Sequence, residues 1–109
     1  MKTADIERNT PVKLKDQISL PDSGVKFEQI CETKHGMALL IALKAGAKID
    51  THSVNAMALA TVVEGSVNFT VEESVHPMGE HDTMVMAPGT PHSVEAVSDA
   101  KIYLVKINA

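Results

Sequence analysis

Three segments of the sequence decide its fold: Gly46-Ala-Lys-Ile-Asp-Thr-His52, Glu64-Gly65 and Met86-Ala-Pro-Gly-Thr-Pro-His92. Each contains glycine, and the third also contains two prolines, the residues that most strongly mark turns. Two of the segments end in a histidine. This arrangement predicts strands joined by tight turns, with two histidines placed just beyond a turn.

The sequence around these segments consists of short runs with the length and pattern of β-strands. Val67, Phe69 and Val71 alternate with polar residues, which is typical of a strand with one buried face. The run 37–43 is apolar throughout and predicts a strand buried on both faces. We expect strands over 25–31, 37–43, 52–55, 56–63, 66–72, 83–87, 92–97 and 101–107, a hairpin at Glu64-Gly65 and a loop around 77–79.

Residues 1–24 lack this pattern. Pro11, Pro21 and Gly24 interrupt them and predict an extended N-terminal arm with one short strand over 12–14, packed along a sheet edge or against a partner subunit. Residues 25–109 form the domain proper. Because that domain shows many short strands and no amphipathic helical pattern, the predicted fold class is all-β, a small antiparallel sandwich or barrel.

The composition excludes several classes of protein. The 109 residues, 44% of them hydrophobic, fit one globular domain. No apolar run approaches the roughly 20 residues of a membrane helix, and the N-terminus has no signal-peptide core, so we expect a cytoplasmic protein without membrane contact. The net charge of −4 and the few aromatic residues argue against nucleic acid as a partner. The single cysteine, Cys31, is expected to be a buried, small apolar residue.

The three segments resemble the two motifs of the cupin superfamily, G-x5-H-x-H-x3,4-E-x6-G and G-x5-P-x-G-x2-H-x3-N. Gly46, His52 and Gly65 match the first motif in order and spacing, and Gly89 and His92 match the second. The resemblance covers about residues 39–107. It implies a jelly-roll barrel, also called a double-stranded β-helix, for residues 25–109.

Five positions depart from these motifs, one of them the proline of the second motif, which falls on Ala87. The second histidine and the glutamate of the first motif fall on Val54 and Ala58. The glycine that opens the second motif falls on His81, and its final asparagine falls on Ala96. In metal-binding cupins three histidines and a glutamate hold the ion, so the resemblance leaves only the His52 and His92 positions as metal ligands. The cofactor is therefore either a weakly held divalent metal (Fe, Mn, Ni or Zn) or none.

A third metal ligand has few sources in the sequence. His81 and Glu64 lie too far along their strands, and Glu95 has the wrong strand parity to join the histidine pair. Asp50 shares the parity of His52 and remains open, as does Asn55 if its strand carries a bulge. The remaining histidines are interpreted as surface residues of turns and loops: His35, His76 and His81.

Strand parity also predicts a pocket beside the histidines. Five apolar residues share parity along their strands and are candidates for its wall: Val54, Ala58, Ala60, Met84 and Met86. Small side chains among them would leave room for a modest hydrophobic or mixed ligand. Ordinary packing of a barrel core explains the same pattern, so both interpretations remain open.

Three functions remain open. The first is a cupin that binds a small molecule in the barrel pocket; if it is an enzyme, we expect a metal-dependent dioxygenase or isomerase type, or acid–base catalysis by one histidine. The second is a non-enzymatic module that binds or senses a metabolite. The third is a dimeric assembly unit whose arm completes a neighbour's sheet. The resemblance also implies a homodimer.

Overall fold

The computed structural model describes residues 1–108, which form β-strands and one short 3-10 helix. The elements are β1 (Lys2–Thr3), η1 (Leu14–Asp16), β2 (Val25–Thr33), β3 (Gly36–Leu43), β4 (Lys48–His52), β5 (Ala56–Glu64), β6 (Val67–Val71), β7 (Ser74–Met78), β8 (Thr83–Met86), β9 (His92–Ala96) and β10 (Ala100–Asn108). No helix within this described part of the chain is long and apolar enough to cross a membrane.

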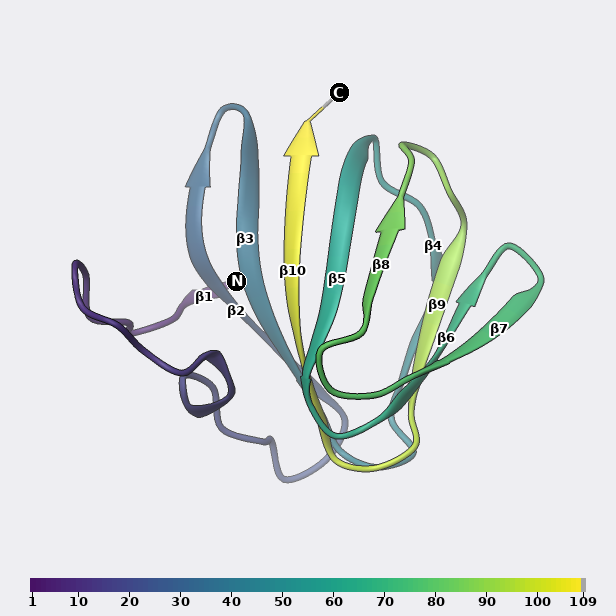
Figure 1. Cartoon of the computed structure of the whole chain (residues 1–109), viewed down its shortest axis with the longest axis horizontal. Coiled ribbons are helices and arrows are strands. Elements are labelled where there is room, and N and C mark those ends of the chain that lie inside the picture. Colours follow the sequence, from purple (N-terminus) through teal and green to yellow (C-terminus); the bar gives the residue numbers. More distant parts are fainter. Residues whose placement is uncertain (109) are drawn as a thin grey trace.

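The strands form two sheets that face each other (Figure 1). The larger sheet has the order β1-β2-β3-β10-β5-β8, and the smaller has the order β4-β9-β6-β7. All strand pairs are antiparallel except β1 with β2. The chain crosses repeatedly from one sheet to the other, which makes the fold a jelly roll and confirms the predicted all-β class.

The main core lies between the two sheets, and β3 shows how the sequence builds it. Leu39, Ile41 and Leu43 belong to this core, whereas the intervening Leu40 and Ala42 belong to a second cluster on the outer face. All five side chains are at most 5% exposed. The predicted burial of residues 37–43 on both faces is confirmed for these five side chains. Both faces are buried because each packs against a different part of the structure.

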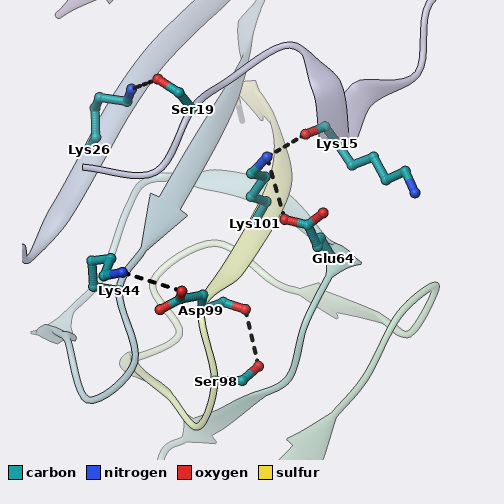
Figure 2. Close-up of polar contacts among 8 residues, drawn as sticks. All are labelled: Lys15, Ser19, Lys26, Lys44, Glu64, Ser98, Asp99 and Lys101. Atoms are coloured by element: carbon teal, nitrogen blue, oxygen red, sulfur yellow. Dashed lines mark hydrogen bonds and ion pairs between the residues drawn. The ribbon is translucent and has the colours of Figure 1, made fainter. Parts of the chain in front are cut away.

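The N-terminal arm supplies the cover for the outer face. β1 pairs with β2 at the sheet edge, and Ile18 packs in the cluster that contains Leu40. Lys101 of β10 holds the arm, because its Nζ donates to the backbone oxygen of Lys15 at 2.6 Å and forms an ion pair with Glu64 at 3.4 Å (Figure 2). The arm therefore closes the second core against its own chain.

The strand predicted over 12–14 is wrong. Leu14 begins the 3-10 helix η1, and its side chain packs against the second core. A segment that crosses the face of a sheet must turn its apolar side chains down onto that face, whereas a strand would need a free sheet edge for its backbone hydrogen bonds.

Glu64 and Gly65 form a corner, and the hairpin predicted there is wrong. β5 lies in the larger sheet and β6 in the smaller one, so these consecutive strands do not pair. Gly65 has a φ of +78°, and a Cβ at this position would overlap the backbone oxygen of Asp99. Glu64-Gly65 has the local sequence of a hairpin turn, but in the fold it is the point at which the chain passes from the larger sheet to the smaller one.

Three other local expectations also differ from the structure. β4 ends at His52, so the strand predicted over 52–55 is wrong, and residues 53–55 lead across to β5. The loop expected around 77–79 contains the end of β7, an edge strand that tolerates Pro77 because an edge leaves one side of the backbone unpaired. Cys31 is exposed, because a bulge between Gln29 and Cys31 shifts the parity of β2.

Replacing Gly65 by Ala is expected to lower the free energy of unfolding by about 2–4 kcal/mol, because steric overlap adds to the strain of a positive φ. Gly46→Ala is the matched control: its φ is +82°, but nothing lies within 4 Å of a Cβ placed there. That variant should lose only about 1 kcal/mol. Urea unfolding followed by circular dichroism measures both, and equal losses would contradict a steric role for the corner.

Candidate functional site

A cavity of about 520 Å³ lies between the two sheets, a volume typical of small-molecule sites. Most of its wall is apolar. Its histidines come from the end of β4 and the start of β9, which meet at the upper end of the barrel in Figure 1. The lining residues are Met1, Phe27, Leu39, Ile41, Ile49, Asp50, Thr51, His52, Ala60, Phe69, His92, Val94, Ile102, Leu104 and Lys106.

His52 and His92 face each other across the β4–β9 pair. They are direct cross-strand partners, and their ring centroids are 4.3 Å apart with the planes tilted by 57°. Phe69 lies on His92 with ring centroids 5.8 Å apart and nearly parallel planes. His92 is 7% exposed, whereas His52 lies at the exposed rim. The two imidazoles thus form one polar site against an aromatic floor.

The backbone fixes the tautomer of both rings. Nδ1 of His52 lies 2.9 Å from the backbone oxygen of Asp50, and Nδ1 of His92 lies 2.9 Å from that of Thr90. A carbonyl oxygen only accepts, so each Nδ1 carries the proton and donates it. Each Nε2 is then left with a lone pair, which can accept a hydrogen bond or bind a metal.

The turn before β9 sets the position of His92. Pro88 and Gly89 are its central residues, and Gly89 has a φ of +79°, as the third position of a type II turn requires. Gly89 donates its N–H to the backbone oxygen of Val54 at 2.8 Å, which ties the turn to the segment that follows His52. Thr90 Oγ1 donates to the backbone oxygen of Ala87 at 2.7 Å. The turn thereby holds the start of β9, which carries His92, beside the chain that follows His52 at the end of β4.

Lys106 is a lining residue that the sequence interpretation missed. It follows Ile102 and Leu104 at intervals of two along β10, and both of these belong to the main core or pack against it. The alternation therefore directs Lys106 to the inside of the barrel. The same alternation was readable from the sequence once Ala100 and Ile102 were assigned to the core.

The cavity wall differs from the pocket proposed from parity. Ala60 lines the cavity, but the other four candidates do not. Ala58 and Met86 are direct partners between β5 and β8 and lie in the filled part of the core, with Met84 packed against it. Val54 follows the end of β4 and contributes its backbone oxygen to the turn before β9. The wall comes instead largely from β3, β4, β9 and β10, which enclose the unfilled side of the barrel.

No third metal ligand joins the histidine pair. Within residues 1–108 no group of three His, Cys, Asp or Glu side chains could hold an ion. A bulge between Ile49 and His52 places two residues, Asp50 and Thr51, against Ser93 alone, so the parity that favoured Asp50 does not hold. His81 lies in an exposed turn with a φ of +74°, where the cupin motif has glycine.

Burial of the His92 ring lowers its pKa below 6.5. The hydrogen bond to the backbone oxygen of Thr90 acts in the opposite direction, and the charges of His52 and Lys106 lower the pKa further. The neutral form of His92 is therefore favoured, which keeps its Nε2 lone pair available near neutral pH.

This lowered pKa predicts a loss of stability in acid. Below pH 6.5 the unfolded chain takes up a proton at His92 before the folded protein does, so the free energy of unfolding falls until the pH passes the folded-state pKa. His92→Asn keeps an N–H donor but removes this titration. Urea unfolding gives the free energy of unfolding of the parent and of the variant. The difference between these two free energies should become smaller as the pH falls from about 7.5 to about 5. An NMR titration that gives His92 a pKa above 6.5 would contradict this account.

Comparison with known proteins places this geometry in a family. The cupin domain model matches residues 39–107. No curated protein matches the chain.

Several solved structures share the fold. A conserved protein of unknown function from Streptococcus pyogenes has a TM-score of 0.89 at 22% identity, over 100% of this chain and 96% of its own. A cupin superfamily protein from Desulfitobacterium hafniense has a TM-score of 0.90 at 11% identity, over 100% of both chains. An RmlC-like cupin from Desulfovibrio desulfuricans has a TM-score of 0.76 at 23% identity, over 98% of this chain and 96% of its own. With the domain match and the jelly roll in agreement, the chain belongs to the cupin superfamily.

Proposed function

We propose that this protein binds a small organic molecule in the cavity between its sheets, with His52 and His92 contacting the ligand through Nε2. The observation that carries the proposal is the cavity itself, about 520 Å³ with mostly apolar walls and two imidazoles of defined tautomer at one end. Pockets with apolar walls and a few fixed polar groups are the usual form of ligand sites.

The site favours a ligand with an apolar body and a hydroxyl or amide group. The apolar walls take up the body, and the Nε2 lone pair of each histidine accepts a hydrogen bond from the polar group. A bound hydroxyl would also lie where a histidine can remove its proton, so binding is the first step of both an enzyme and a sensing module. Turnover of the bound molecule would distinguish the enzyme from the sensor.

The metal that the cupin family implies does not fit these residues as a complete centre. His52 and His92 supply two donors, whereas catalytic zinc sites generally use three protein ligands. Lys106 lines the same cavity and brings a positive charge that opposes a cation. The pair could hold Fe, Mn, Ni or Zn only weakly, and we assign no chemical step to an ion.

The neutral probe 1-phenyl-1,2-ethanediol tests the cavity proposal. It should bind with a Kd on the order of 1 mM, as expected for a ligand of this size, and shift the amide NMR signals of cavity-lining residues such as Val94 and Leu104. His92→Ala should weaken binding about fivefold through the lost hydrogen bond. Ser93→Ala, one residue along β9 on the outer face, is the matched control and should have no effect.

Two results would contradict the cavity proposal. One is the absence of shifts in the lining residues at saturating diol. The other is near-stoichiometric metal in protein purified without a histidine tag, lost in both His52→Ala and His92→Ala, which would indicate a metal centre in place of the metal-free pocket.

The third function, a dimeric assembly unit, has support from a different surface. On the outer face of the larger sheet, beyond the arm, Met57, Val85 and Ile107 are 38%, 60% and 53% exposed. Met57 is the cross-strand partner of Ile107, and Leu59 is the cross-strand partner of Val85 and of a residue in β10. Cross-strand partners share a face of the sheet, so these side chains lie on one surface. β8 also ends the sheet with one unpaired edge, which could pair with β8 of a second copy, an arrangement that two-fold symmetry makes self-complementary.

The assembly proposal predicts a dimer in sedimentation velocity at about 10 μM, a concentration at which many specific homodimers are associated. Val85→Lys should convert it to a monomer by placing like charges at the two-fold axis. Val75→Lys is the matched control, since Val75 is 59% exposed on β7, the edge strand of the other sheet. A monomeric parent protein, or equal dissociation in both variants, would contradict β8 as the interface.

A further inference from the structure

Lys106 is a cation without an anionic partner inside a ligand cavity. It lines the cavity together with the two histidines and is half-buried. Among residues 1–108 it takes part in no ion pair and in no side-chain hydrogen bond. The other lysines that face folded structure behave differently.

These half-buried lysines, Lys26, Lys44 and Lys101, each lie 3.3–3.7 Å from a carboxylate. Figure 2 shows two of these pairs, Lys44 with Asp99 and Lys101 with Glu64. Since the other half-buried lysines form ion pairs with carboxylates of the chain, the unpaired Lys106 in the cavity favours an anionic ligand from outside the chain. A charge moved away from water gains stability when a counter-ion meets it.

The rest of the cavity agrees with an anionic ligand. The one acidic residue that lines it is Asp50, and the bulge in β4 sets Asp50 against Ser93, on the outer side of the smaller sheet. Besides Asp50, the lining residues carry one ammonium group and two imidazoles, so a single carboxylate faces three groups that can meet an anion. Such a set of groups repels cations and attracts oxyanions.

We propose that the ligand is a small organic acid whose carboxylate pairs with Lys106 Nζ, while its apolar body lies against Leu104, Ile41 and Phe69 and a hydroxyl donates to a histidine Nε2. This inference rests on the proposed function, since it names the class of molecule that the cavity binds.

The test compares two probes of nearly the same shape. Mandelate carries a carboxylate where 1-phenyl-1,2-ethanediol carries a neutral hydroxymethyl group, and both keep the phenyl ring and the adjacent hydroxyl. At about pH 8, where mandelate is fully ionised, amide NMR titration should give mandelate an affinity about tenfold higher than the diol. A charge-assisted hydrogen bond is the source of the difference.

Lys106→Met should remove this preference, lowering mandelate affinity about tenfold and changing diol affinity less than twofold. Lys106→Gln keeps a polar side chain and serves as a second variant should the methionine disturb folding. Lys48→Met is the matched control for net charge, because Lys48 pairs with Glu95 on the outer face of the smaller sheet. It should leave both affinities unchanged.

The outcomes separate this inference from the proposed function. Diol binding in the cavity, with mandelate no tighter or with Lys106→Met weakening both probes equally, would overturn the organic-acid proposal and leave the cavity proposal standing. An equal loss of mandelate affinity in Lys48→Met would also overturn it, because the effect would then reflect net charge. The absence of binding by either probe would overturn both proposals.

Discussion

The pairing of β10 with both β3 and β5 is the interaction on which the rest of the structure depends. β10 runs antiparallel to β3 from Ala100 to Ile107 and to β5 from Lys101 to Asn108. The last strand of the chain thus joins a hairpin formed early in the sequence to strands formed later. Its register also directs Ile102, Leu104 and Lys106 toward the smaller sheet, so one pairing sets both the core and a wall of the cavity.

The cavity exists because the two sheets are filled unequally. At the end of the barrel that contains the Glu64-Gly65 corner, buried residues such as Val62, Val67 and Ala100 are 0–1% exposed and pack the two sheets together. Toward the other end, the small side chain of Ala60 and the flat rings of Phe69 and His92 leave the space unfilled. A barrel that packed this end with larger side chains would gain hydrophobic stability and lose the cavity.

His92 and Lys106 line the same cavity, and the charge of Lys106 acts on the pKa of His92. Burial of the His92 ring is the main cause of its lowered pKa, and the charge of Lys106 acts in the same sense. The result is a neutral acceptor beside a fixed cation. That combination suits a molecule with both an acidic group and a hydroxyl, and Ala58, which stands where the cupin motif has glutamate, supplies no carboxylate for a metal ion.

The sequence by itself determined the all-β class and most of the strands, because alternation and turn residues are local properties, and its resemblance to the cupin motifs implied that His52 and His92 share a site. Tertiary structure decided the rest. Glu64-Gly65 became a corner because its flanking strands found partners in different sheets, and bulges at Cys31 and Asp50 reversed the faces that simple parity assigned. Lys106 entered the cavity only once β10 was placed opposite the smaller sheet. Which strand pairs with which, and where a ladder slips by one residue, depends on contacts between residues far apart in the chain, and local pattern does not contain them.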